Sequence, residues 1–143
     1  VVGHLRDRPE FAKWSDRIRR EAFTDYIAYL ELVAECDLVV VPLADDAFNK
    51  CKSVVRFIDA AVTSTPVVAS AVGDYDELLE HGRTAFLVRN RQWRTVLREA
   101  VSNAALRKKV GANARQFVAE KFSTDSYRPG IGEPFGQTVL GGE

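Results

Sequence analysis

The sequence contains no methionine and only two cysteines, Cys36 and Cys51, among its 143 residues. These cysteines form no metal-ligand spacing with either histidine, so neither a zinc site nor a disulfide framework is expected. So few cysteines fit a reducing compartment, and we expect a cytoplasmic location with Cys36 buried as a small apolar side chain. Because the chain has no initiator methionine and opens on strand-like residues, we also expect it to be part of a longer protein.

The sequence also lacks an excess of charge and any long hydrophobic run. Its twenty basic and twenty acidic side chains cancel, which gives no electrostatic reason to expect nucleic acid or an anionic membrane as a partner. The longest apolar stretch, from Leu38 to Ala44, is far too short to span a bilayer. The opening residues show no signal-peptide pattern. We therefore expect a soluble globular domain with no transmembrane segment.

What the sequence does contain is an alternation of short apolar runs with amphipathic segments. Strand-like runs cover residues 38–43, 67–70 and 85–88, and residues 1–3 look like the end of another strand. The run that starts at Leu38 is apolar on both faces, which is typical of a central parallel strand covered by helices on each side. We expect one parallel sheet that contains Val39, Val41, Val67, Val68 and Leu87.

Helical spacing of apolar residues fills the segments between these strands. It predicts helices over residues 10–22, after a cap at Asp25, over 52–63, 74–80 and 93–101, and from 105 onward. The helix after Asp25 should present Ile27 and Ala34 on one face. Phe57, Ile58 and Val96 should pack on the sheet.

Strands that alternate with helices predict an α/β fold, a Rossmann-like parallel sheet with helices on both faces. Residues 1–122 are expected to form one incomplete domain of this kind. Residues 123–143 are rich in proline and glycine and are expected to be an extended or disordered tail. Because part of the sheet would be absent, an exposed edge predicts dimerisation or poor solubility.

The chemistry is expected at the carboxyl ends of the strands, where open parallel sheets bind their ligands. Residues 44–53, residues 71–76 and the loop after Val88 occupy that edge. The first segment carries two carboxylates, an amide, two ammonium groups and a hydroxyl, and it leads into a helix. The N–H groups of a helix N-terminus suit a phosphate, and Lys52 and Ser53 would add a charge and a donor. Alternatively, Ser53 is only a helix cap and Lys52 a solvated side chain.

Two further features limit the kinds of ligand site that the sequence can form. There is no Gly-x-Gly-x-x-Gly and no phosphate-binding loop of the Gly-Lys-Ser type, which disfavours dinucleotide and NTPase folds. Asp59 lies in a largely apolar helix, seven positions after Lys52 and therefore on the same face. A carboxylate so close to a core needs a partner or a ligand. The candidates are Arg56, a nearby backbone donor, or a bound molecule.

The order of these landmarks resembles the C-terminal, donor-binding domain of retaining GT-B glycosyltransferases, the group 1 or family 4-like enzymes. The matching stretch runs from about Tyr26 to Phe122. It rests on Val41-Pro42, Phe48-Asn49, Lys52-Ser53, Asp59-Ala60-Ala61, Thr65-Pro66-Val67-Val68, Gly73-Asp74-Tyr75, His81-Gly82-Arg83-Thr84, Trp93 and Asn113-Ala114-Arg115.

The resemblance implies transfer of a sugar from a nucleotide-diphosphate sugar to an acceptor hydroxyl, with no metal and no other cofactor. Asn49, Lys52 and Ser53 would contact the donor, and Asp59 would accept hydrogen bonds from its ribose. Gly73 and Tyr75 would lie beside them, with Tyr75 either in contact with the donor or simply packing at a turn. The resemblance identifies no catalytic residue. The acceptor and any base are expected on an N-terminal domain, so this chain alone should not turn over.

One departure from the family keeps other functions open. Many members carry two glutamates eight positions apart, and here Asp59 stands at the second place while Cys51 stands at the first. Either Asp45 or Asp46 substitutes for the first carboxylate, or the Asn-x-x-Lys-Ser pattern marks a subgroup that does without it. The missing carboxylate also favours an alternative, a non-catalytic GT-B-like assembly module.

A third candidate is a phospho-receiver signalling domain, which is also a doubly wound sheet. Asp37 or Asp45 would then be the phosphorylated residue. Such a domain needs an acidic cluster after its first strand and a lysine after a late strand. The cluster is not seen, and Arg89 stands where the lysine would be, so this alternative is the weakest of the three.

Overall fold

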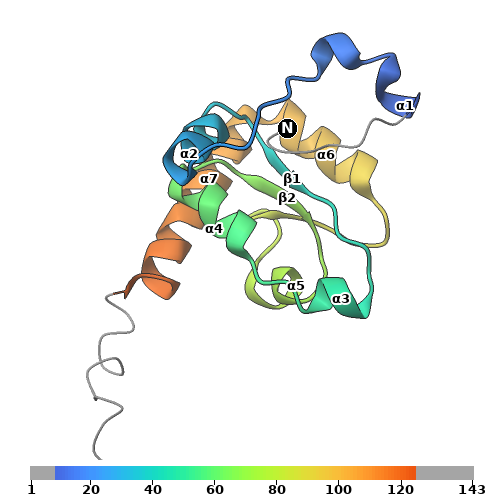
Figure 1. Ribbon diagram of the computed structural model, residues 1–143. Helices are drawn as coiled ribbons and strands as arrows, with labels where there is room; N and C mark the ends of the chain where they lie inside the picture. Colours follow the sequence, from blue (N-terminus) through green and yellow to red (C-terminus); the bar gives the residue numbers. More distant parts are fainter. Residues whose placement is uncertain (1–8, 125–143) are drawn as a thin grey trace, which may run out of the picture.

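The structure is a computed structural model that describes residues 9–124, and its centre is a three-stranded parallel sheet in the order β1-β2-β3 (Figure 1). The strands are β1 (Val39–Val41), β2 (Val67–Ser70) and β3 (Phe86–Val88). Val39 lies opposite Val67, and Val68 lies opposite Phe86. The predicted α/β fold with parallel strands is confirmed, and the five residues expected in the sheet all lie in it.

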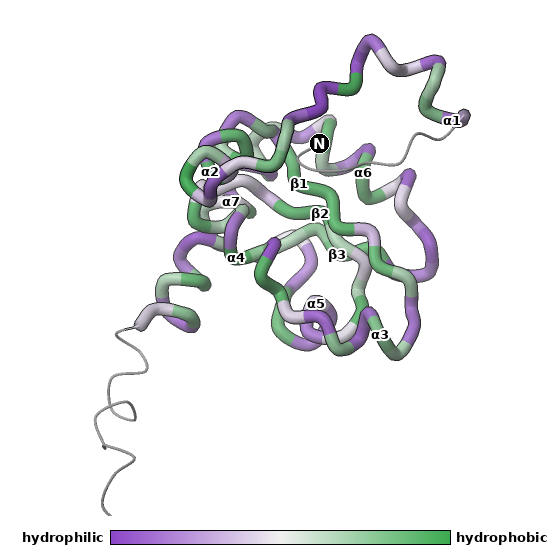
Figure 2. Tube along the Cα trace, in the orientation of Figure 1, coloured by the Kyte–Doolittle hydropathy of each residue, from purple (hydrophilic) through white to green (hydrophobic). Residues whose placement is uncertain are grey.

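Helices connect and flank these strands. They are α1 (Pro9–Ala12), the 3-10 helix η1 (Ser15–Arg17), α2 (Tyr26–Ala34), α3 (Ala47–Lys50), α4 (Val55–Val62), α5 (Asp74–Leu78), α6 (Trp93–Ser102) and α7 (Ala104–Lys121). In Figure 2 the strands are mostly green, whereas the purple, hydrophilic residues lie along the helices and connecting segments around them. The apolar runs of the sequence therefore form the interior of the sheet.

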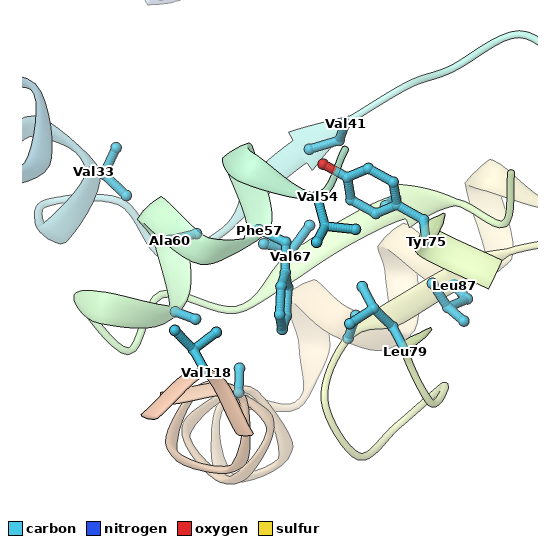
Figure 3. Close-up of a cluster of buried hydrophobic side chains, with 14 residues drawn as sticks. Val33, Val41, Val54, Phe57, Ala60, Val67, Tyr75, Leu79, Leu87 and Val118 are labelled. Atoms are coloured by element: carbon cyan, nitrogen blue, oxygen red, sulfur yellow. The ribbon is translucent and has the colours of Figure 1, made fainter. Parts of the chain in front are cut away.

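Helices cover both faces of the sheet, as predicted. On one face Val67 and Leu87 pack with Phe57 of α4 and with Val118 near the end of α7 (Figure 3). On the other face Val68, Phe86 and Val88 pack with Val96 and Ala100 of α6 and with Val110 of α7. Helix α7 therefore contributes to both clusters, which holds the two layers of helices in one unit.

The absence of a side chain at Gly111 allows α7 to approach the turn between α4 and β2. A Cβ atom at this position would lie 2.0 Å from the carbonyl oxygen of Ser64. Such a distance is far below van der Waals contact, so only glycine permits this packing. Helix α4 is in turn held against α7 by the edge-to-face pair of Phe57 and Phe117, whose ring centroids are 6.1 Å apart.

The prediction of one helix over residues 10–22 is wrong. The structure has only α1 and η1 in this segment, and α1 lies away from the sheet (Figure 1). Phe11 and Trp14, which the spacing placed on a buried face, are 41% and 46% exposed. The reason is that an amphipathic helix draws most of its stability from burying its apolar face, and no described element covers these residues.

The helix after Asp25 forms as predicted, but it buries a different face. The Asp25 carboxylate accepts a hydrogen bond from the backbone N–H of Ala28 at 3.0 Å, which confirms the cap. Val33 is buried while Ile27 is 65% exposed. The backbone carbonyl of Val33 accepts a hydrogen bond from the Thr65 hydroxyl at 3.1 Å, and this contact fixes the rotation of α2.

Two further predictions about the core need correction. Cys36 is exposed rather than buried, because it follows the end of α2 and its thiol donates to the carbonyl of Leu32. Strand β1 is not covered on both sides: Val41 is 2% exposed but Val40 is 44% exposed. Helix α6 packs against β2 and β3, and among residues 9–124 β1 is an edge strand.

The helix predicted over residues 52–63 begins later, at Val55, and a separate short helix, α3, precedes it. The strand end expected at residues 1–3 and almost all of the expected tail at 123–143 lie outside the described residues. The dimer expected from an exposed sheet edge stays a prediction.

Candidate functional site

A cleft of about 840 Å³ lies at the carboxyl ends of all three strands. It is lined by residues 43–45 after β1, residues 70–72 at the end of β2, and residues 88–91 with Trp93 after β3. This is the edge at which open parallel sheets bind ligands, and its volume falls in the range of small-molecule sites. The three segments that the sequence assigned to this edge do meet here.

Ser70 ties the cleft-lining loop after β1 to the end of β2. Its hydroxyl donates a hydrogen bond to the carbonyl of Leu43 at 2.8 Å and accepts one from the Leu43 N–H at 2.9 Å. Ser70 is buried, so this pair of bonds fixes the backbone at the point where the loop leaves the sheet. The loop that follows is therefore positioned by the sheet itself.

The loop after β1 is organised by its own carboxylates. Asp45 lines the cleft and forms an ion pair with Lys50 at 2.9 Å, and the Asp45 carboxylate raises the pKa of Lys50. Asp46 caps α3 by accepting from the Asn49 N–H at 2.8 Å, and it also accepts from the Asn49 side-chain amide at 2.8 Å. Asn49 is thus buried and occupied in holding the loop.

The loop after β3 brings two arginines to the opposite wall of the cleft. Arg89 forms an ion pair with Asp76 of α5. Asn90 and Arg91 both have positive φ angles, +50° and +59°, a conformation that costs non-glycine residues free energy and is concentrated at functional sites. Trp93 then begins α6. The cleft therefore combines cationic, amide, carboxylate and aromatic groups around one opening.

Lys52 and Ser53 lie in the exposed segment between α3 and α4. The Lys52 ammonium lies 4.8 Å from the ring centroid of Phe48, which is itself 74% exposed. The first residue before α4 is Val54, and no side chain caps the helix, so Ser53 is not the helix cap. Because α4 begins at Val55, Lys52 lies outside the helix and does not share a helical face with Asp59, which corrects that expectation.

Asp59 is a buried carboxylate, 7% exposed, on the second turn of α4. Its partner is Tyr26 of α2, whose hydroxyl donates to Asp59 Oδ1 at 2.8 Å, rather than Arg56 or a backbone donor. This hydrogen bond raises the pKa of Tyr26. The Asp59 charge also raises the pKa of Tyr29, although burial is the larger cause there.

Gly73 and Tyr75 hold the neighbouring loop in place. Gly73 has φ +55°, and a Cβ atom there would lie 2.5 Å from the carbonyl oxygen of Lys50, so the loops after β1 and β2 approach each other through this glycine. Tyr75 is 2% exposed, and Figure 3 shows its ring pointing across the core cluster toward Val41 and Val54. Burial raises the pKa of Tyr75 to about 12.

None of the predicted site residues lines the cleft. Gly73 meets the loop after β1, Tyr75 lies within the electrostatic reach of Asp59, and Lys52 and Ser53 are exposed beside the start of α4. Sequence reasoning named the loop after Val88 as part of this edge but singled out none of residues 89–93 as ligands. The position of Arg89 and Arg91 directly after an apolar strand was the available signal.

The described part of the chain shows neither a metal-ligand cluster nor a membrane span. Between residues 9 and 124 no three His, Cys, Asp or Glu side chains are grouped so that they could hold a metal ion. No helix in the same range is long and apolar enough to cross a bilayer.

Two solved structures share this fold. The crystal structure of Anabaena Alr3699/HepE in complex with UDP and glucose is 21% identical with a TM-score of 0.67, and the match covers 82% of this chain and 31% of that chain. The C-terminal domain of LpcC from Francisella tularensis, a glycosyl transferase group 1 family protein, is 17% identical with a TM-score of 0.56, over 82% of this chain and 66% of that chain.

The sequence comparisons agree with the fold. A D-inositol 3-phosphate glycosyltransferase of Nocardioides sp. (strain ATCC BAA-499 / JS614) is 36% identical over 84 residues, which are 57% of this chain but only 17% of that protein. The family model described as glycosyl transferases group 1 matches residues 1–105. This match rules out the alternative that the chain is a phospho-receiver domain. The chain belongs to the glycosyl transferases group 1 family.

Proposed function

We propose that this chain binds a nucleotide-diphosphate sugar at the carboxyl edge of its sheet and serves the transfer of that sugar to an acceptor hydroxyl. The family membership supports this, and so does the fold, because the similar Anabaena protein was crystallised with UDP and glucose. The chain matches 17% to 31% of the length of its larger relatives. We therefore assign the acceptor side and any base to a further domain, with this chain inactive alone.

The observation that carries the proposal is the path of the loop after β1. Its first residues line the cleft, and its last residues lead into α4, which carries the buried carboxylate Asp59. One loop thus connects a polar cleft of ligand size with a helix N-terminus and a buried hydrogen-bond acceptor. A diphosphate, a ribose and a sugar need these three environments side by side.

Each part of the donor then has a proposed place. Lys52, Ser53 and the first turn of α4 neutralise the diphosphate in place of a metal ion. Asp59 accepts hydrogen bonds from the ribose hydroxyls. The cleft takes the sugar, which polar groups such as Asp45 and Asn90 orient beside the Trp93 ring. Holding the donor and neutralising the leaving diphosphate are the protein's main contributions to such a transfer.

A cytoplasmic location is part of the proposal. Cys36 and Cys51 are both exposed free thiols, and exposed thiols persist where the environment is reducing.

The second candidate function is a non-catalytic module with the same fold. The observation that favours it is Cys51, an exposed thiol where many family members carry a carboxylate. A thiol accepts hydrogen bonds only weakly and does not replace a carboxylate toward sugar hydroxyls. The two candidates differ in one measurable property, the binding of nucleoside diphosphates.

The proposal predicts separate effects of two substitutions on nucleotide affinity in the full-length protein. Lys52→Ala should weaken uridine diphosphate by about 1.5–3 kcal/mol, as for a hydrogen bond to a charged group, and should hardly affect uridine. Asp59→Asn should weaken both ligands, since both contain ribose. Isothermal titration calorimetry measures both, with adenosine and guanosine diphosphates tested alongside because the base is not identified.

Lys121→Ala is the matched control for the lysine substitution. Lys121 lies 5.9 Å from the ring centroid of Phe117 on the last turn of α7, a contact similar to that of Lys52 with Phe48. Its removal should leave nucleotide affinity unchanged. If both Lys52→Ala and Asp59→Asn fold normally and bind nucleotides like the unaltered protein, the donor site is elsewhere and the non-catalytic module becomes the better assignment.

A further inference from the structure

The hydrogen bond between Tyr26 and Asp59 engages only one of the two carboxylate oxygens of Asp59. Oδ1 accepts from the Tyr26 hydroxyl at 2.8 Å. Within residues 9–124, Oδ2 accepts no side-chain or backbone hydrogen bond, and no fully buried side-chain oxygen or nitrogen in that range lacks a partner. Oδ2 therefore reaches the surface, although Asp59 as a residue is only 7% exposed.

This arrangement leaves one acceptor oxygen at the surface of an otherwise buried side chain. A carboxylate has about four lone-pair positions, and the single bond from Tyr26 leaves those of Oδ2 open. Burial of the remainder of Asp59 among apolar residues of α4 limits competition from water, which makes a hydrogen bond to Oδ2 stronger than at an exposed carboxylate.

Tyr26 is placed to fix this orientation and has few other described contacts. It is the first residue of α2, whose start is held by the Asp25 cap. Its side chain is 57% exposed, and its ring meets that of Tyr29 at a centroid distance of 6.3 Å. An exposed tyrosine contributes little to the core, so the bond to Asp59, which joins residues 33 apart in sequence, is its main interaction.

We propose that Tyr26 is a positioning residue, which holds Asp59 Oδ1 so that Oδ2 faces outward and accepts from the vicinal hydroxyls of the donor ribose. The inference rests on the proposed function. A tyrosine phenol is protonated at neutral pH and donates to the carboxylate, and this bond raises the pKa of Tyr26 further. Without the hydroxyl the carboxylate would rotate between orientations, and ordering it again on binding would reduce affinity.

The test compares uridine diphosphate with 2′,3′-dideoxyuridine diphosphate, which keeps the base and the diphosphate but lacks the ribose hydroxyls. In the full-length protein, Tyr26→Phe should weaken uridine diphosphate by about 5- to 10-fold, the value of one net hydrogen bond. The dideoxy ligand should bind Tyr26→Phe and the unaltered protein equally well. Tyr29→Phe, which removes a hydroxyl from the same helix with no bond to Asp59, should change neither affinity by more than about twofold.

The outcomes separate this inference from the function on which it rests. If Tyr26→Phe weakens both ligands equally, the bond is only a structural link between α2 and α4, and the inference is overturned. An unchanged affinity for uridine diphosphate in Tyr26→Phe, with a loss in Asp59→Asn, overturns the inference and leaves the proposed function standing. If the unaltered protein binds none of the uridine, adenosine and guanosine diphosphates, both are overturned.

Discussion

Replacing Gly73 by alanine should lower the free energy of unfolding by about 2–6 kcal/mol. Gly73 has φ +55° and ψ −136°, a conformation that side-chain-bearing residues adopt at a cost of roughly 1–3 kcal/mol. The new Cβ would also lie 2.5 Å from the carbonyl oxygen and 3.0 Å from the Cα of Lys50. Both are backbone atoms, so α3 and its loop must move, which adds about 1–3 kcal/mol of overpacking. Urea unfolding measures the sum.

Gly82→Ala is the matched control for this substitution. Gly82 also has a positive φ, +73°, but a Cβ there would meet no atom within 4 Å. Its replacement should cost only the conformational penalty, about 1–2 kcal/mol. Equal losses for the two variants would mean that the close approach of the loops at Gly73 has no energetic consequence. If the proposed donor site is correct, Gly73→Ala alone should also weaken nucleotide binding, because it displaces the loop that leads to Lys52.

Replacing Phe57 by alanine should lower the free energy of unfolding by about 3–5 kcal/mol, as for other fully buried aromatic residues. Phe57 is 0% exposed and packs against Val67 of the sheet (Figure 3). It also joins α4 to Phe117 of α7. The substitution removes this ring from the centre of the larger cluster and leaves a cavity that rigid neighbours fill only partly. Because a domain has a total stability of about 5–15 kcal/mol, the loss should be visible as a much lower urea midpoint.

Val55→Ala, in the same helix, provides the comparison. Val55 is 55% exposed, so its truncation removes little buried surface and should change stability by no more than about 0.5 kcal/mol. A loss for Phe57→Ala that is no larger than the loss for Val55→Ala would contradict the packing of α4 between the sheet and α7.

The elements that the sequence predicted best are those in which local pattern and tertiary packing agree. The apolar run at 67–70 becomes β2, buried at all four positions, and the spacing from Ala105 onward becomes α7 with Val110, Ala114 and Val118 inward. The prediction of a helix over residues 10–22 failed, because an amphipathic segment forms a stable helix only when another element covers its apolar face. Phe11 and Trp14 are exposed, which shows that no element among residues 9–124 covers this apolar face.

The position of the cleft at the strand ends was predictable, and so was the need of Asp59 for a partner. Asp59 is the one carboxylate in a largely apolar helix, and its type and position alone required a partner. The partner itself was not predictable, because Tyr26 lies 33 residues earlier and no local pattern links an exposed tyrosine to a distant aspartate. The same holds for the cleft, which Arg89 and Arg91 line together with Asp45 at the ends of the strands.

The sequence by itself determined the alternation of strands and helices, the parallel sheet and the edge at which the cleft lies, because these follow from periodicity and from the geometry of strand connections. Only the tertiary structure decided that Lys52 lies outside α4, that Tyr75 is a core residue and that Tyr26 holds Asp59. These three features depend on where each helix begins and on how the helices are rotated against one another. Contacts between residues distant in sequence determine both the helix starts and the rotations.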